Sequence, residues 1–447
     1  MEHKVKLAVL SVMLCANAIA DPVYLPPGQN LTYGSSSNNQ SIMSSIANPA
    51  AAAAELSRED SQYRAGILTI GGGFEVGKVD NLFNQIDSTK TTLTTAQTVP
   101  PSVIAGGGAS VATYINTNVV NPVNSLTSAV QQDGNATVFF GGHVPLTPLV
   151  VTKKNWGGSF VLDANISAIA NMAFLADPLA QLTAADGNAI IASGGIYTPP
   201  ANDSALLVKA AVVQEVGLGY SRPVLSRGDG DLTAGVRAKF YQVKLARNAQ
   251  KLVSSNGAQN TLNASQTYKS NTGVGLDVGT LWTAKRYRVG AWVNNLNKPS
   301  FKYNTVDAAS LTAAGFTNTA ITSQIIGDVT YDMKPQLQLE GAFFSESQNW
   351  VINAGLDGNT VQDAVGRDFK WATLSAAYAT DSWWIPGARV GYRANMAGSK
   401  LRYATAGLTF FKALSLDVAY GLDSITDNNG KTIPRSAMIN LGLQMTF

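Results

Sequence analysis

The chain has very little of the side-chain chemistry on which disulfides, metal sites and most catalytic centres depend. It has one cysteine and two histidines among 447 residues. Cys15 and His3 lie in an N-terminal leader, so the mature chain is expected to keep only His143. Without cysteine, the mature protein has no disulfide, no thiolate nucleophile and no cysteine-ligated zinc, and we expect no cofactor of that kind.

Charge is also scarce. Asp, Glu, Lys and Arg make up 14% of the chain, and the formal net charge is +3. A nucleic-acid partner would require a clustered basic face, and the sequence contains no such cluster, so we expect no nucleic-acid binding. Glycine, in contrast, is abundant at 41 residues. This small, uncharged composition favours closely packed strands.

The leader has the three parts of a secretory signal peptide. Lys4 and Lys6 precede an apolar run from Leu7 to Cys15, and Ala18-Ile19-Ala20 supplies small residues at the cleavage spacing. We therefore expect residues 1–20 to be removed by cleavage after Ala20. A lipoprotein modified at Cys15 is the alternative, and the bulky Leu14 before that cysteine disfavours it.

Long apolar runs are absent after the leader. No later segment approaches the roughly 20 apolar residues that a helix needs to cross a bilayer. Lipid cannot satisfy backbone groups at an open sheet edge. A membrane location would therefore require a closed sheet.

The C-terminal strand indicates such a location. One of its faces is entirely apolar, with Ile439, Leu441, Leu443, Met445 and Phe447. The other face is polar or glycine, with Asn440, Gly442, Gln444 and Thr446. A strand that ends on its last apolar residue is typical of bacterial outer-membrane barrels, and we expect Phe447 to act as the signal for the barrel-assembly machinery. A soluble β-protein, the competing class, rarely ends this way.

The same two-residue period recurs along the chain. Its polar face carries Gly, Ser, Thr, Asn and Gln with few charges, which is typical of a barrel interior whose apolar side meets outer-membrane lipid. We predict an all-β fold, a transmembrane antiparallel β-barrel of about 14 strands with an N-terminal plug and a helical extracellular loop. The predicted strands are Arg64–Val76, Asn135–Gly142, Gly157–Ala170, Ala205–Tyr220, Asp231–Ala246, Thr272–Ala284, Tyr287–Leu296, Gln324–Asp332, Gln336–Phe344, Phe369–Tyr378, Ala388–Asn395, Arg402–Phe411, Leu414–Leu422 and Ser436–Phe447.

The connections alternate between long and short, as outer-membrane barrels require. We predict that Ser345–Asp368 is one of the long extracellular loops, and that Met333–Pro335 and His143–Trp156 are periplasmic connections. The longest loop, Gly77–Gly134, carries helical spacing and exceeds the length of a simple loop. A soluble β-protein has no reason to alternate in this way.

Residues 21–62 precede the first predicted strand and are long enough to fold into the lumen as a plug. Their helical pattern covers Ser41–Leu56 and includes Asn48-Pro49-Ala50. We therefore divide the chain into a signal peptide at 1–20, a plug at 21–62 and an outer-membrane barrel at 63–447.

Several motifs resemble known barrel families. Asn48-Pro49-Ala50 and the glycine-rich first strand resemble the plug and first strand of FadL-type hydrophobic-compound transporters. The rest is more similar to the TraF-like conjugal-transfer family of outer-membrane barrels, at Glu215–Arg222, Gly235–Tyr241, Trp292–Phe301 and Gly391-Tyr392-Arg393. That family name is shared with a thioredoxin-like periplasmic protein, whose cysteines this chain lacks. The resemblance implies an outer-membrane barrel associated with conjugation.

Candidate catalytic and metal sites are few. His143 is the only imidazole base, but it lies in a Gly-Gly-His-Val-Pro turn and no Gly-x-Ser-x-Gly elbow accompanies it, so a structural role is favoured over a hydrolase centre. Asp229-Gly230-Asp231 could bind calcium or form a turn before a strand, and the turn is favoured. We predict a non-enzymatic protein with no cofactor and no metal.

Seven charged residues share the polar face of predicted strands and are expected to point into the lumen. They are Arg237, Lys239, Asp277, Glu340, Arg389, Arg393 and Asp417. One interpretation is a salt-bridge network that braces the wall and plug, because unpaired buried charge is costly. The other is a constriction that sets selectivity.

Two functional hypotheses remain. The first is an outer-membrane barrel associated with conjugal transfer, with conjugation or envelope proteins as partners. The second is a FadL-like passive channel for small hydrophobic compounds, closed at rest by the plug. Both place the protein in the outer membrane of a Gram-negative bacterium.

Overall fold

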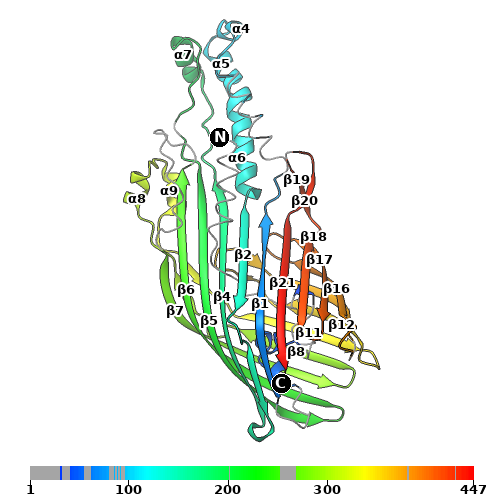
Figure 1. Cartoon of the computed structure of the whole chain (residues 1–447). Coiled ribbons are helices and arrows are strands. Elements are labelled where there is room, and N and C mark those ends of the chain that lie inside the picture. Colours follow the sequence, from blue (N-terminus) through cyan, green and yellow to red (C-terminus); the bar gives the residue numbers. More distant parts are fainter. Residues whose placement is uncertain are drawn as a thin grey trace.

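The computed structural model describes residues 31–32, 41–54, 62–79, 85, 88, 91, 96–200, 202–251, 268–379, 382–427 and 429–446. The predicted signal peptide, its cleavage site after Ala20 and the terminal Phe447 lie outside these residues. Figure 1 shows the strands forming one barrel with helices above it.

The wall is a single antiparallel sheet that closes on itself. The sheet has 15 strands, of which β2 and β3 share one wall position end to end, so the barrel has 14 positions. The predicted all-β antiparallel barrel is therefore confirmed. The wall strands are β1 (Gln62–Val76), β2 (Ala136–His143), β3 (Leu149–Lys153), β4 (Gly158–Leu175), β5 (Ala205–Arg227), β6 (Gly230–Lys251), β7 (Lys269–Ala284), β8 (Tyr287–Asn294), β11 (Gln336–Phe344), β12 (Trp350–Asp357), β15 (Trp371–Tyr378), β16 (Gly387–Asn395), β17 (Arg402–Phe410), β18 (Leu414–Gly421) and β21 (Ser436–Thr446).

The first and last strands close the barrel. β1 pairs with β21 from Arg64↔Thr446 to Glu75↔Ser436. On its other side β1 pairs with β2 near one end and with β3 near the other. We call the end at which β21 finishes the lower end, which is at the bottom of Figure 1.

Alternation along the strands separates an apolar exterior from a polar interior. On β16, Val390 is 62% exposed while its neighbour Arg389 is 3% exposed. The same holds on β12, where Ile352 faces out and Asn353 is buried. An exposed apolar band around a buried polar face is the pattern that a membrane barrel presents to lipid.

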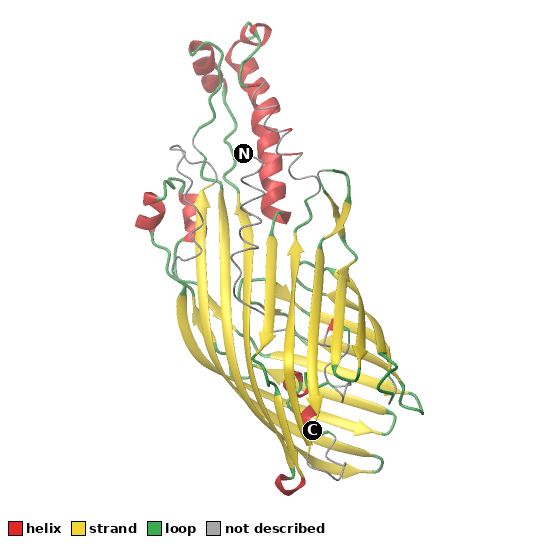
Figure 2. Ribbon diagram, in the orientation of Figure 1, coloured by secondary structure: helices red, strands yellow, loops and turns green. Residues whose placement is uncertain are grey.

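Helices rise above the upper end. The β1–β2 connection forms α4 (Pro101–Ile104), α5 (Gly107–Ile115), the π-helix η3 (Asn116–Val120) and α6 (Asn121–Asp133), and the β4–β5 connection adds α7 (Ala184–Ala192). Figure 2 shows these helices standing beyond the strands, as the prediction of a helical extracellular loop requires. We call residues 96–135 and 176–200 together the tower. Among the described residues, no helix is both long and apolar enough to cross a bilayer.

The remaining connections of the upper end contain smaller elements. The β8–β11 connection holds β9 (Ser300–Lys302), α8 (Ala308–Ala313), α9 (Thr319–Ile325) and β10 (Thr330–Asp332). The β12–β15 connection holds the pair β13 (Val361–Gln362) and β14 (Asp368–Phe369). The β18–β21 connection holds β19 (Ser424–Thr426) and β20 (Thr432–Pro434).

One predicted strand is wrong. Gln324–Asp332 contains the end of α9 and the three-residue β10 instead of a wall strand. Asn318 caps α9 by accepting the Ala320 N–H at 2.8 Å, and Ile321 and Ile325 lie one turn apart and buried. Capping and burial of this pair outweigh the β-branched composition that favoured a strand.

Three predicted connections are also corrected. Ser345–Asp368 is not one loop, because it contains the wall strand β12, and its first residues form a turn at the lower end. Met333–Pro335 follows β10 at the upper end, and Met333 is fully buried there. His143–Trp156 contains β3. One lost strand and one gained strand leave the count of 14 unchanged.

Candidate functional site

The inward face of β6 passes through every layer of the lumen. In the antiparallel geometry, successive inward residues are about 6.8 Å apart along the strand. The inward residues, from the lower end to the upper, are Gly235, Arg237, Lys239, Tyr241, Val243, Leu245 and Arg247, and all are buried. The lumen therefore changes from glycine, through charge, to aromatic and aliphatic side chains.

The lowest layer holds the N-terminal segment 41–54. It forms α2 (Ser44–Ala47) and the 3-10 turn η2 (Ala51–Ala53) in place of the single helix predicted over Ser41–Leu56. The break is at Asn48, whose φ of −112° and ψ of 115° are extended. Proline excludes the helical conformation from the residue before it, so Pro49 ends α2.

The side chain of Asn48 fixes this turn and joins it to the wall. Its Oδ1 accepts the Ala50 N–H at 2.9 Å, and its Nδ2 donates to the Thr280 carbonyl of β7 at 3.2 Å. Asn48 and Ala50 have no exposed surface. All three residues of the predicted Asn48-Pro49-Ala50 motif lie against the wall.

Two glycines make room for the motif. A Cβ added at Gly235 would overlap the Pro49 carbonyl oxygen, and a Cβ added at Gly279 would overlap Asn48 Oδ1. We call this pair the glycine notch. Here glycine is required for close approach of two backbones rather than for an unusual φ.

Further contacts hold the rest of segment 41–54. The Ile42 N–H donates to Gln444 of β21 at 2.9 Å, and the Ser159 hydroxyl of β4 donates to the Ala52 carbonyl at 3.0 Å. An apolar cluster joins this segment to the wall and contains Ile42, Met43, Ile46, Ala52, Val150 and Val161.

Arg237 links the segment to the layer above. Its Nη1 donates to the Ile46 carbonyl at 3.0 Å. Its Nη2 lies 2.8 Å from Asp163 Oδ2 and 2.6 Å from Glu215 Oε1. One guanidinium, 6% exposed, thus joins α2, β4 and β5 to β6. Such a buried charge must keep its partners, because removing one leaves an uncompensated ion.

The other predicted lumen charges are all buried but form separate groups. Lys239 Nζ lies 2.8 Å from Asp277 Oδ1. On the opposite side of the barrel, Arg389 binds Asp417 through two nitrogens at 2.8 and 2.5 Å. The structure does not bring the seven residues into one ring.

Arg393 and Glu340 have different surroundings. The Arg393 guanidinium lies over the Trp371 ring, 4.0 Å from its centroid. Glu340 accepts a hydrogen bond of 2.5 Å from Asn353 on the neighbouring strand β12. Neither contact is an ion pair.

The sequence-based choice of residues missed Asp163 and Glu215. Asp163 accepts from Arg237 and also lies 2.6 Å from Nδ1 of His143, and it is fully buried. Both acids have the inward parity of strands that were predicted, so alternation alone could have identified them as lumen residues. Parity does not reveal which charges meet.

His143 stands where the wall is interrupted. Residues 144–148 separate β2 from β3, and Val144 and Leu146 are 48% and 62% exposed. Hydrogen bonds flank the interruption. The Ala164 carbonyl accepts from the Val144 N–H at 2.8 Å and from the Thr147 hydroxyl at 3.0 Å, and the Gly66 N–H donates to the Pro148 carbonyl at 2.9 Å.

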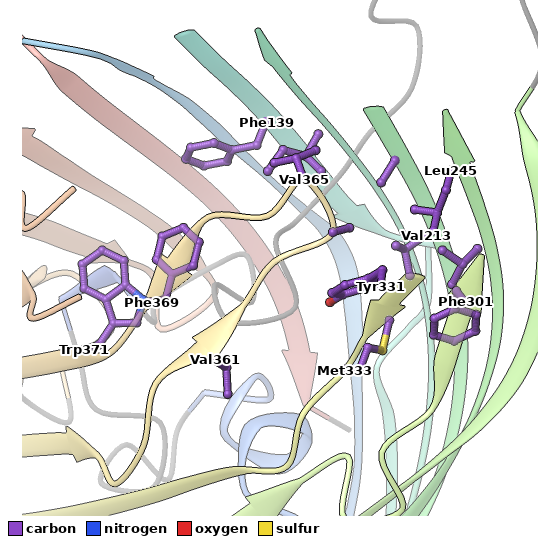
Figure 3. Close-up of a cluster of buried hydrophobic side chains, with 14 of the residues drawn as sticks. Phe139, Val213, Leu245, Phe301, Tyr331, Met333, Val361, Val365, Phe369 and Trp371 are labelled. Atoms are coloured by element: carbon purple, nitrogen blue, oxygen red, sulfur yellow. The ribbon is translucent and has the colours of Figure 1, made fainter. Parts of the chain in front are cut away.

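The upper lumen is filled by loops that fold inward. Figure 3 shows Phe301, Tyr331 and Met333 of the β8–β11 connection beside Leu245 and Val213 of the wall. Phe301 has no exposed surface and contacts Tyr241 edge to face, with ring centroids 6.0 Å apart. This apolar cluster includes wall residues of eight strands, β2, β4, β5, β6, β15, β17, β18 and β21. They are Phe139, Ile169, Ala211, Val213, Tyr241, Val243, Leu245, Trp371, Tyr403, Ala419 and Met438.

The β13–β14 segment crosses the lumen. The Tyr303 hydroxyl donates to the Ala364 carbonyl, joining the two inward loops. Arg367 reaches Glu75 at the upper end of β1, with 3.1 Å between Nη1 and Oε2, and also pairs with Asp363 at 2.9 Å. Thus a loop between β12 and β15 is tied to β1. Within the described ranges, no three His, Cys, Asp or Glu side chains form a group that could hold a metal.

The closed antiparallel wall with its apolar exterior defines the class, an outer-membrane β-barrel. The chain belongs to the family described as "F plasmid transfer operon, TraF, protein", whose model matches residues 45–357, from within α2 to the end of β12. The resemblance to the TraF-like family is thereby confirmed.

Several solved structures are similar at low identity. The "TodX deltaS2S3 mutant monoaromatic hydrocarbon channel" has 11% identity and a TM-score of 0.44, covering 96% of this chain and 99% of that chain. The Pseudomonas putida toluene transporter TodX has 12% identity and a TM-score of 0.37, with the same coverage. A Pseudomonas aeruginosa FadL homologue has 12% identity and a TM-score of 0.33, again covering 96% and 99%. No curated protein matches the chain.

Proposed function

We propose that this protein is a non-enzymatic outer-membrane barrel that serves conjugal transfer through its outer surface, with its lumen closed by its own chain. Membership of the TraF family supports the association with conjugation. The observation that carries the proposal is the double occupation of the lumen. Segment 41–54 fills the lower layer, and the inward loops fill the upper one.

The tower is the part that would meet a partner. Its own apolar core includes Val111, Ile115, Val119, Leu179 and Ile190, so it folds as a unit above the barrel. Residues 96–135 and 176–200 contain no Lys, Arg or His. A rigid, nearly uncharged projection favours contact with a protein of the conjugation or envelope machinery over contact with nucleic acid.

The N-terminal residues 21–62 act as the plug in this proposal, and residues 63–447 as the barrel. The lumen charges brace it: the pairs made by Arg237, Lys239 and Arg389 hold the wall and segment 41–54 together. The signal peptide at 1–20 directs export to the periplasm and is removed by cleavage after Ala20. Phe447 then presents the last strand to the barrel-assembly machinery, which inserts it into outer-membrane lipid.

A hydrolase function is disfavoured by the setting of His143. Its Nδ1 is hydrogen-bonded to Asp163, which also forms an ion pair with Arg237. Its Nε2 is buried and has no hydrogen-bond partner among the described residues, whereas a general base needs a nucleophile there. We assign His143 a structural role beside the interruption of the wall.

The second candidate function is passive passage of small hydrophobic compounds. The observation that favours it is the interrupted wall position between β2 and β3. Val144 and Leu146 are exposed there, and Val150 of the adjoining β3 packs against segment 41–54. Displacement of that segment would be the opening step.

Gene deletion and complementation separate the two functions. A variant with a short linker in place of residues 96–134 removes most of the tower and leaves the wall intact. We expect it to assemble, shown by heat-modifiable migration, but to restore less than about a tenth of the mating frequency. Full mating with the trimmed tower, or unaltered mating in the deletion strain, would contradict the proposal. Liposome uptake with and without residues 21–62 tests the channel.

A further inference from the structure

The outer face of the lower end carries an aromatic and cationic cluster that neither function uses. Lys153 Nζ, at the end of β3, lies 4.9 Å from the centroid of the Trp156 ring and 5.7 Å from that of Tyr63. Trp156 packs edge to face on Phe160 at 5.4 Å, and Phe160 contacts Tyr220 at 4.8 Å. We call these five residues the Lys153 cluster.

The cluster faces lipid, not the lumen. Tyr63, Trp156 and Phe160 are 39%, 46% and 40% exposed. The strands of Phe160 and Tyr220 carry apolar outward residues directly above them, Leu162 on β4 and Leu218 on β5. A cation over aromatic rings at the lower edge of an apolar band is at the level of the lipid headgroups.

A second cation shares this face. Arg222 follows Tyr220 by two residues on β5, so it takes the next outward position towards the lower end, and it is exposed. Among the described residues, no carboxylate lies within ion-pair distance of Lys153 or Arg222. The nearby lower turn between β7 and β8 differs, because Arg286 there pairs with Glu346 at 2.6 Å.

We propose that the Lys153 cluster and Arg222 form a binding site for an anionic phospholipid of the inner leaflet. The two cations would bind the phosphodiester group, and the aromatic rings would lie beside the glycerol region. Leu149, Val151 and Leu162, outward on β3 and β4 above the cations, would contact an acyl chain. The hydrogen bond of 3.0 Å from the Tyr220 hydroxyl to the Trp156 carbonyl joins β5 to the residues that precede β4, and so fixes the cluster before lipid binds.

The position of Lys153 differs from that of an ordinary snorkelling lysine at a membrane surface. A snorkelling side chain needs only water at its tip. Lys153 instead lies over two rings, which keeps its ammonium at a fixed place on the wall. Fixed donors of this kind lower the ordering cost of a bound headgroup.

The test is native mass spectrometry of the full-length protein, titrated in detergent with palmitoyl-oleoyl phosphatidylglycerol or, as the neutral reference, phosphatidylcholine of the same chains. K153Q/R222Q removes the two cations, and K285Q/K412Q removes two others from the same rim. We expect K153Q/R222Q to bind phosphatidylglycerol about thirtyfold more weakly, equivalent to about 1 kcal/mol for each cation. The control variant should stay within about twofold of the wild type.

Each alternative outcome is decisive. Unchanged phosphatidylglycerol binding by K153Q/R222Q, equal loss in the control variant, or equal binding of phosphatidylcholine by the wild type would overturn the site. Heat-modifiable migration checks that both variants are folded, and the single substitutions K153Q and R222Q replace the double variant if it does not fold. W156L keeps both cations and should weaken binding about fivefold through loss of the ring contact.

Discussion

Gly235 and Gly279 face each other across the β6–β7 ladder, and their missing side chains form the notch that receives Asn48 and Pro49. Both wall strands therefore lack a side chain at one height of the barrel, where a segment from the N-terminal part of the chain packs against them. The glycine notch fixes the position at which segment 41–54 binds to the wall, so a single substitution in the notch tests that position.

The first prediction concerns this notch. G235V should push the Asn48-Pro49 turn off the wall, because its side chain would overlap the Pro49 carbonyl. The only cysteine, Cys15, lies in the predicted signal peptide, so a reporter at the buried Ser45, S45C, would be unique in a chain cleaved after Ala20. We expect maleimide labelling of S45C to be at least about tenfold faster in G235V, since local opening exposes it.

The control for this prediction is another inward glycine of the lower wall. A Cβ at Gly219 of β5 meets only ordinary contacts, the nearest being the Val236 carbonyl at 3.4 Å. G219A should leave S45C as slowly labelled as in the wild type. Equal labelling in all three proteins would mean that the notch does not hold the segment.

The second prediction concerns Arg237. R237A leaves Asp163 and Glu215 buried without their cation, a loss that typically costs about 3–5 kcal/mol. Urea unfolding in detergent micelles should show this loss, and S45C should label faster. R402A removes an exposed pair with Asp423 and should cost at most about 1 kcal/mol. Equal losses of stability in R237A and R402A would show that the buried contacts of Arg237 stabilise the barrel no more than an exposed ion pair does.

The third prediction concerns His143. H143A removes one hydrogen bond to a charged partner, so we expect a loss of stability of about 1.5–3 kcal/mol. Assembly and mating frequency should be unchanged. The non-enzymatic account fails if the purified protein has an esterase or protease activity that H143A abolishes.

The fourth prediction is that the two lumen barriers act in series. Deleting residues 21–62, or replacing 359–369 with a short linker, should each leave the barrel non-conducting in planar bilayers. The double variant should show ohmic conductance, because the lower layer is then gone and, of the two inward loops, only the β8–β11 connection remains in the upper lumen. Conductance in the variant that lacks only 21–62 would show that the upper layer is not a barrier.

Sequence alternation was enough to predict the barrel and the inward direction of residues such as Arg389 and Asp417. The strand number of 14 also agrees, because the lost strand at Gln324–Asp332 is offset by the unpredicted β12. Alternation failed at Gln324–Asp332, because a buried Ile321–Ile325 pair and an Asn318 cap are tertiary and local effects that a two-residue period does not register. Alternation also could not predict the partners of Arg237. These partners lie on three different elements, and their positions depend on strand register and on the turn at Asn48. The inward-folding loops could not be predicted from alternation either, because their apolar residues do not follow the two-residue period of a strand.

The most direct test of the account is mating with the plug locked. The Ser159 hydroxyl donates to the Ala52 carbonyl, so the cysteine pair A52C/S159C can be joined by a disulfide or a short bis-maleimide, and the one natural cysteine, Cys15, lies in the predicted signal peptide. We predict that a deletion strain carrying the locked barrel mates at the wild-type frequency, within about twofold, as do the single-cysteine controls. Loss of mating on locking, with recovery on reduction of the disulfide, would contradict a function that resides in the outer surface.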